Sequence, residues 1–86
     1  MITVRVKYAG LARNKAGLKE EKWHLKENTS LEQLVDLIAA RYNWSPEDKE
    51  QNIVLCNHHG VSLEDRARYL LRDRDLIQVL SPVSGG

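Results

Sequence analysis

The chain has 86 residues, the size of one small domain, and a domain this small buries only about 60–65% of the surface that its unfolded chain exposes. Its 13 lysines and arginines against 12 aspartates and glutamates leave a formal net charge of +1, without the concentrated positive charge that binding to nucleic acid or a membrane surface requires. Hydrophobic residues at 42% and charged residues at 29% are typical of a globular protein and argue against disorder.

The first part of the chain predicts two strands joined by a short helix. Apolar and polar side chains alternate over residues 2–8, which places one set on each face of a strand. Residues 10–17 have room for two helical turns, which Gly17 would end. A second strand is expected over residues 21–26, where Trp23 and Leu25 alternate with Lys22, His24 and Lys26.

The strongest helix signal covers residues 30–42. Capping-box spacing occurs twice at its start, in Thr29 with Glu32 and in Ser30 with Gln33. The apolar stripe behind it has the i, i+3, i+4, i+7 spacing of an amphipathic helix and consists of Leu31, Leu34, Val35, Ile38 and Tyr42. We therefore expect one main helix that packs on the sheet.

The second half predicts a polar connector followed by short strands. Ser45, Pro46 and Glu47 are typical of a helix cap with proline at the first helical position, so one short helical turn is expected there. The apolar run 53–56 predicts a strand that is covered on both faces or nearly so. The remaining expected elements are a turn at 58–60, a brief strand at 61–63, a turn at 73–75 and a last strand at 76–81.

This order predicts an α+β fold in which a mixed sheet of four to five strands packs on one main helix. Residues 1–81 would form the domain and residues 82–86 a flexible tail, because Pro82 cannot continue a sheet ladder and Gly85 and Gly86 have no side chain to pack. A glycine carboxylate on an extended arm can enter a channel that any Cβ would block. ATP could there convert it into an acyl-adenylate, without catalytic side chains from this chain.

The last strand carries a candidate interface. Ile77 and Val79 share one of its faces, and Leu76 and Leu80 share the other. If the first pair faces the core, the two leucines lie on the open face of the sheet beside the tail, where apolar surface suits a partner protein. A loop that covers them is the alternative.

Several segments together resemble the MoaD/ThiS family of sulfur carriers, which have the ubiquitin-like β-grasp fold. The most specific segment is Ser81-Pro82-Val83-Ser84-Gly85-Gly86, which is similar to the Pro-Pro-Val-x-Gly-Gly ending of the family's molybdopterin synthase small subunits. The other segments are Val4–Arg13, Thr29–Leu31, Leu55–Asn57 and Asp73–Val79.

The resemblance implies that a ubiquitin-activating-type enzyme uses ATP to adenylate Gly86, which a sulfur-donor system then converts to a thiocarboxylate. Gly85 would let the tail fit its channel, and Pro82 and Val83 would bind the large subunit of molybdopterin synthase as sulfur passes to a pterin precursor. We further expect Leu76 and Leu80 to dock on these partners. No metal or cofactor bound by the chain itself is expected.

Departures from the family pattern keep other branches open, among them those at Arg74, at Ser81, at His58 and His59, and in the long connector 43–52. Arg74 stands where the family usually has glycine in an Asp-Gly-Asp turn, and because arginine resists positive φ we expect a different turn geometry. Ser81 replaces the first proline of the tail and should make it less stiff. Sulfur transfer for thiamin or tRNA, and attachment of Gly86 to other proteins as a ubiquitin-like modifier, therefore remain alternatives.

The remaining candidates for chemistry have simpler interpretations. Cys56 with His58 and His59 would supply at most three zinc ligands from one loop, so a buried structural cysteine is the favoured interpretation. The arginines of residues 66–74 alternate with acidic residues and indicate a solvated loop of mixed charge, with docking of an acidic partner as the alternative. A lone cysteine, no apolar run of about 18–20 residues and no signal-peptide block predict a cytoplasmic protein.

Overall fold

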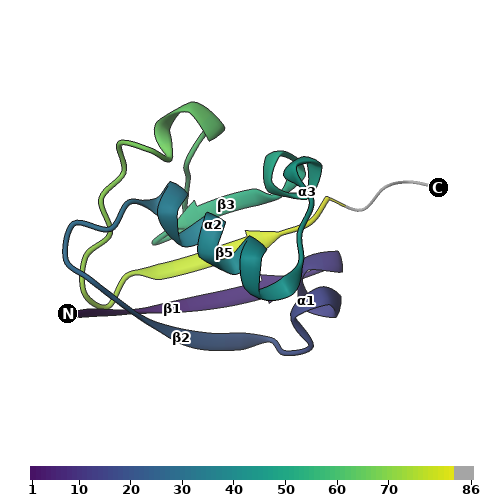
Figure 1. Cartoon of the computed structure of the whole chain (residues 1–86), viewed down its shortest axis with the longest axis horizontal. Helices are drawn as coiled ribbons and strands as arrows, with labels where there is room; N and C mark the ends of the chain where they lie inside the picture. The colour runs from purple at the N-terminus through teal and green to yellow at the C-terminus, as the bar shows by residue number, and fades with distance from the viewer. Residues whose placement is uncertain (83–86) are drawn as a thin grey trace.

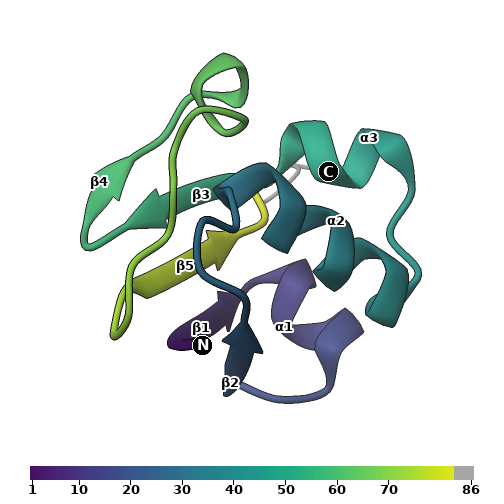
Figure 2. The same cartoon turned by 60° about the vertical axis from the view of Figure 1, so that its left-hand side comes forward.

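Within residues 1–82, which the computed structural model describes, five strands form one mixed sheet, and the helices lie over one of its faces (Figure 1 and Figure 2). In chain order the elements are β1 (Ile2–Ala9), α1 (Leu11–Ala16), β2 (Glu20–Leu25), α2 (Leu31–Tyr42), α3 (Pro46–Gln51), β3 (Ile53–Cys56), β4 (His59–Gly60), the 3₁₀ helix η1 (Leu63–Asp65) and β5 (Leu76–Leu80). The strand order is β2-β1-β5-β3-β4, with β1 and β5 parallel and the other pairs antiparallel. The predicted α+β class is confirmed.

The core lies between the sheet and α2. Every second residue of β1 is buried, from Ile2 to Tyr8, and in β5 the buried residues are Ile77 and Val79. The predicted stripe of α2 faces them, with four of its five positions buried: Leu31, Leu34, Val35 and Ile38. Periodicity alone therefore identified both halves of the core.

The ends of α2 follow from its sequence. The Ser30 hydroxyl accepts a hydrogen bond from the Gln33 N–H at 3.1 Å, and the Gln33 side chain accepts one from the Ser30 N–H at 2.9 Å. The second of the two predicted capping boxes is thus the one that forms. Asn43 ends the helix in the left-handed conformation at φ 57°, which asparagine tolerates better than most residues.

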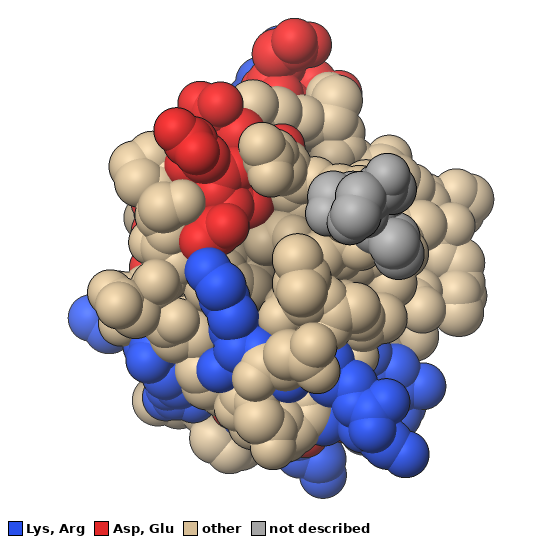
Figure 3. Space-filling view, turned by 90° about the vertical axis from the view of Figure 1, so that its right-hand side faces the viewer, with Lys and Arg blue, Asp and Glu red and all other residues tan. Residues whose placement is uncertain are grey.

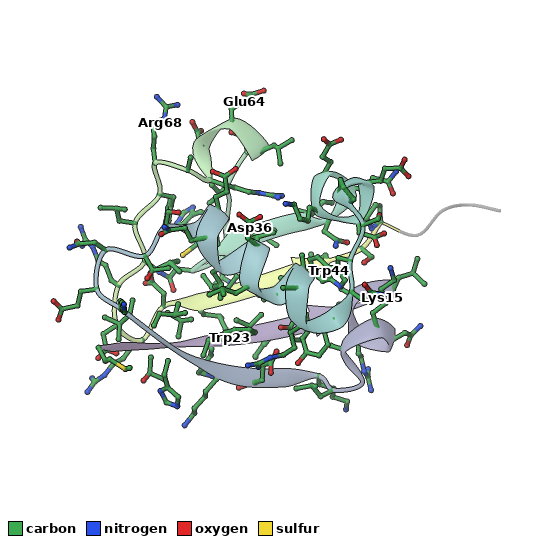
Figure 4. The ribbon with its side chains drawn as sticks, viewed as in Figure 1. Lys15, Trp23, Asp36, Trp44, Glu64 and Arg68 are labelled. Carbon is green, nitrogen blue, oxygen red and sulfur yellow. The ribbon has the colours of Figure 1, made fainter. Side chains whose placement is uncertain are left out.

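A partly buried carboxylate joins the sheet to the C-terminal end of α2. Glu21 accepts hydrogen bonds from the hydroxyls of Tyr8 at 2.5 Å and Tyr42 at 2.7 Å, and from the Arg41 guanidinium at 3.2 Å. The same guanidinium lies 3.9 Å from the centre of the Trp23 ring (Trp23 is labelled in Figure 4). Burial raises the pKa of Glu21, but these donors outweigh it and hold the pKa of the carboxyl below its ordinary value.

The hairpin from β3 to β4 differs from the prediction. Asn57 and His58 both have positive φ, at 51° and 71°, and form a two-residue turn that pairs Cys56 with His59. The predicted turn at 58–60 and strand at 61–63 are therefore wrong by one to three residues, because the tight turn starts at the asparagine. The prediction that the apolar run 53–56 is covered on both faces is also wrong, since Ile53 is 51% exposed.

The turn before β5 also corrects the sequence analysis, because Arg74 does adopt a positive φ of 70°. Its N–H donates to the Thr3 carbonyl at 2.7 Å, and the Thr3 N–H donates to the Asp73 carboxylate at 2.8 Å. The Asp75 N–H closes the turn on the Arg72 carbonyl at 3.2 Å. These bonds to β1 impose the left-handed conformation in spite of its cost.

None of the helices within residues 1–82 is long and apolar enough to cross a membrane.

Candidate functional site

The predicted site begins where the chain leaves the sheet, just after β5. Ser81 is half-buried there and Pro82 is exposed. The other tail residues singled out from the sequence, Val83, Gly85 and Gly86, lie outside the described residues. Figure 3 shows the molecule from the end at which the tail departs.

Ser81 is fixed on three sides. Its hydroxyl oxygen accepts a hydrogen bond from the Ala12 N–H at 2.8 Å, and the same hydroxyl donates to the side-chain oxygen of Asn52 at 2.7 Å. Its N–H donates to the Ala9 carbonyl at 3.3 Å. Ser81 is therefore held at its own position by side-chain bonds that a proline could not make. The expected loss of stiffness concerns the tail, most of which lies outside the described residues.

Gly10 permits this close packing. A Cβ at residue 10 would lie 2.9 Å from the carbonyl oxygen of Ser81, and Gly10 has a positive φ of 66°. Both facts favour glycine at this corner between β1 and α1. We call the set Gly10, Ala12, Asn52 and Ser81 the exit clamp.

The exit clamp rests on a buried arginine. Asn52 is 6% exposed and caps the end of α3, and its carbonyl accepts a hydrogen bond from Arg66 at 2.8 Å. Arg66 also donates to the Lys49 carbonyl at 2.9 Å and is itself 4% exposed. The expectation of a solvated loop is thus wrong for Arg66, whose positive charge lies on the C-terminal carbonyls of α3, where the helix dipole favours it.

A cavity of about 50 Å³ lies beside the clamp, with Lys15, Trp44, Asn52 and Pro82 among its lining residues. Lys15 and Trp44 lie at the same end of the molecule in Figure 4. Pockets for small-molecule ligands typically have volumes of about 300–1,000 Å³. The cavity is too small for a nucleotide or a pterin, so the clamp side of this chain does not itself enclose such a substrate.

The open face of the sheet carries the expected leucines. Ile77 and Val79 are buried, so Leu76 and Leu80 lie on the opposite face and are partly exposed. Strand register places Ile53 beside Leu80. Together with Leu55 on the same face of β3, these residues form what we call the open-face patch: Ile53, Leu55, Leu76 and Leu80.

The sequence analysis missed Ile53 and Leu55. A run of four apolar residues contains no alternation, so it does not show that only Val54 and Cys56 face the helices. The arrangement of helices over a single face of the sheet was the missing information. Ile53 is the most exposed member of the patch, and it adds apolar surface beside Leu80, the last residue of β5.

Charge is divided across the end of the molecule at which β5 ends. On the end of the molecule shown in Figure 3, acidic side chains gather on the side of α3 and basic side chains on the side of α1. Exposed Glu47 lies on α3, and exposed Arg13 lies on α1. Lys15 and Asp48 bridge α1 and α3 with an ion pair of 2.6 Å.

Cys56 is fully buried, which confirms its interpretation as a structural residue. Burial raises the pKa of its thiol, which opposes the thiolate form that a nucleophile requires. His58 and His59 are exposed in the hairpin. Within residues 1–82, no group of three histidine, cysteine or acidic side chains is placed to hold a metal ion.

Comparison with known proteins identifies the family. The sequence matches the model of the ThiS family over residues 6–86. No curated protein sequence matches it at a significant level.

Solved structures with similar folds include three that cover nearly the whole chain. Molybdopterin converting factor subunit 1 from Pyrococcus furiosus is 26% identical, with a TM-score of 0.79 over 96% of this chain and 100% of that chain. A complex of subunits 1 and 2 of molybdopterin-converting factor from Helicobacter pylori contains a similar chain, 28% identical, with a TM-score of 0.61 over 99% and 100%. Small archaeal modifier protein 1 from Methanosarcina acetivorans is 23% identical, with a TM-score of 0.74 over 100% and 98%. The resemblance seen in the sequence is confirmed, and the chain belongs to the ThiS family, with the ubiquitin-like β-grasp fold.

Proposed function

We propose that this chain is a sulfur carrier that acts in the cytoplasm as the small subunit of a molybdopterin synthase. The observation that carries the proposal is the family match, which continues through Gly85 and Gly86. In the fold, the residue that follows the last strand, Ser81, is held by the exit clamp. Two similar structures above 25% identity are molybdopterin-converting-factor subunits, which favours this branch.

The chemistry belongs to the carboxylate of Gly86. In the first step one of its oxygens attacks the α-phosphorus of ATP, which forms an acyl-adenylate and releases pyrophosphate. In the second step hydrosulfide from a sulfur donor attacks the acyl carbon, so a C–S bond forms, the acyl C–O bond to AMP breaks, and AMP leaves with the electron pair. The product is a thiocarboxylate, and no oxidant or reductant is needed. Gly85 and Gly86 let this group enter an active site that would exclude a Cβ.

The protein partners follow from the same reasoning. The cavity beside the tail exit holds only about 50 Å³, so in our proposal Gly86 reacts in the active site of a partner, first an adenylating enzyme and then a large synthase subunit. The Helicobacter pylori relative occurs in a complex with subunit 2. In our proposal the open-face patch, Pro82 and Val83 contact these partners, because apolar surface beside the tail is where a partner that receives Gly86 must sit.

A second candidate function uses the same first step. If a lysine amine rather than hydrosulfide attacks the acyl-adenylate, the chain becomes amide-linked to another protein as a ubiquitin-like modifier. Its likeness to small archaeal modifier protein 1 favours this possibility at the level of the fold. Sulfur transfer toward thiamin or tRNA is also compatible with the family match.

Reconstitution distinguishes these functions. The chain is incubated with ATP, a sulfide source, the ubiquitin-activating-type enzyme and the large synthase subunit of the same genome, and a pterin precursor. Formation of the dithiolene that depends on Gly86 supports the proposal. A thiocarboxylate that accumulates without dithiolene contradicts the molybdopterin assignment, and conjugates with a Gly-Gly remnant on lysine support the modifier function instead.

A further inference from the structure

The exit clamp joins three parts of the chain that are far apart in sequence. The Ser81 hydroxyl accepts from Ala12, which is 69 residues away, and donates to Asn52, which is 29 residues away. Gly10 lets the Ser81 carbonyl approach the corner between β1 and α1. The last residue before Pro82 is therefore held from the β1–α1 corner and from the end of α3.

Within the exit clamp, Asn52 is itself held by neighbouring residues. Asn52 is held by its own N–H, which donates to Asp48 at 3.1 Å, and by its carbonyl, which accepts from Arg66 at 2.8 Å. Asn52 and Arg66 are both more than nine-tenths buried. These bonds hold the backbone of Asn52 in a buried position, from which its side-chain oxygen accepts the hydrogen bond of Ser81.

We propose that Ser81 and Asn52 are positioning residues that set the direction in which the tail leaves the domain, an inference that rests on the proposed function. Because Ser81 precedes a proline, the backbone of Ser81 is biased toward extended conformations. The ring of Pro82 fixes the φ of Pro82 at about −65°. With the Ser81 side chain fixed as well, the path of the chain is defined through Pro82.

Direction matters because Gly86 is four residues beyond Pro82 in the sequence. Four residues span at most about 14 Å when fully extended. A pivot of about 10° at Ser81 would displace the far end of such a span by about 2 Å. Loss of the clamp should spread the free chains over more tail directions, so a smaller fraction presents Gly86 in the direction that the partner accepts.

The test compares matched hydroxyl deletions in ATP–pyrophosphate exchange by the ubiquitin-activating-type enzyme of the same genome. Ser81→Ala removes the clamp, whereas Ser81→Thr keeps a hydroxyl. Ser30→Ala deletes a serine hydroxyl from the N-cap of α2, which is of the same chemical kind but outside the clamp. Thermal unfolding of each variant shows that the chains are folded at the assay temperature.

Ser81→Ala should raise the KM for the chain roughly three- to tenfold while kcat stays unchanged, because fewer free chains are competent to bind. Ser81→Thr should recover the wild-type KM, and Ser30→Ala should leave it unchanged although it also lowers stability. A KM for Ser81→Ala within twofold of wild type, or an equal rise for Ser30→Ala, overturns the inference alone. Absence of exchange with the wild-type chain contradicts the proposed function itself, and the inference with it.

Discussion

Arg74→Gly should make the domain more stable, although it removes an entire charged side chain. Arg74 is the third residue of the turn from Arg72 to Asp75 and has a φ of 70°. A positive φ at that position is typical of a type II turn, which favours glycine. The hydrogen bonds that hold the turn use the backbone of Arg74, and glycine retains them.

The size of the effect follows from two opposing terms. A left-handed conformation costs a residue with a Cβ about 1–2 kcal/mol, which glycine avoids. Glycine loses about 0.5–1 kcal/mol more backbone entropy on folding than alanine does. The Arg74 side chain is 93% exposed and its distance to Asp73 is 4.0 Å, so its loss has little effect. The net stabilisation is about 0.5–1 kcal/mol, or a rise of about 2–8 °C in Tm for a domain of this size.

Urea unfolding and calorimetry of three variants test this reasoning. Arg74→Gly should raise the urea concentration at the midpoint of unfolding without changing the dependence of the unfolding free energy on urea. Arg74→Ala keeps the Cβ in the left-handed region and should gain nothing. Arg72→Gly places glycine at an exposed neighbour without positive φ and should destabilise by about 0.5–1 kcal/mol. If Arg74→Gly lowers stability as Arg72→Gly does, backbone strain at Arg74 is refuted.

Three further predictions concern other parts of the molecule. Glu21→Gln should lower the free energy of unfolding by about 1–3 kcal/mol. Because burial is outweighed by hydrogen-bond donors and the pKa of Glu21 is lowered in the fold, its contribution is present above the unfolded-state pKa and is lost as pH falls through the folded pKa. The free energies of unfolding of wild type and variant, measured by urea titration at several acidic pH values, should therefore converge as the pH falls. A difference between them that stays constant with pH would contradict this. The buried Cys56 thiol should react with a thiol reagent only as fast as the domain opens, and rapid labelling of native protein would be inconsistent with its burial. Leu80→Glu should weaken binding to the large synthase subunit in titration calorimetry and leave the fold intact, whereas Leu37→Glu, at an exposed leucine of α2, should not; equal affinities would remove the open-face patch as an interface.

The elements with strong periodicity could be predicted from the sequence. The alternation in β1 and the stripe of α2 each specify one buried face, because a side chain's direction repeats every two residues in a strand and about every 3.6 residues in a helix. Both sets of residues are buried as predicted. Leu76 and Leu80 were placed correctly for the same reason, since β5 also alternates.

What the sequence could not supply depends on contacts between distant residues. The run 53–56 has no alternation, so only the packing of helices on one face of the sheet reveals that Ile53 is exposed. The positive φ of Arg74 is imposed by hydrogen bonds to Thr3, 71 residues away along the chain. In the sequence, Ser81 is only a replacement for a proline of the family pattern. Its hydrogen bond to Asn52 becomes visible only in the fold, which brings the two residues together.

Intact-mass spectrometry of the chain after incubation with ATP, its adenylating enzyme and a sulfide source tests the central claim most directly. The proposed function predicts a mass gain equal to the exchange of one oxygen for sulfur, dependent on ATP and absent when Gly86 is deleted. That deletion should leave the thermal unfolding midpoint unchanged, because glycine at the end of a chain has no side chain to pack. An unchanged mass of the wild-type chain, or an equal gain in the chain that lacks Gly86, would contradict it.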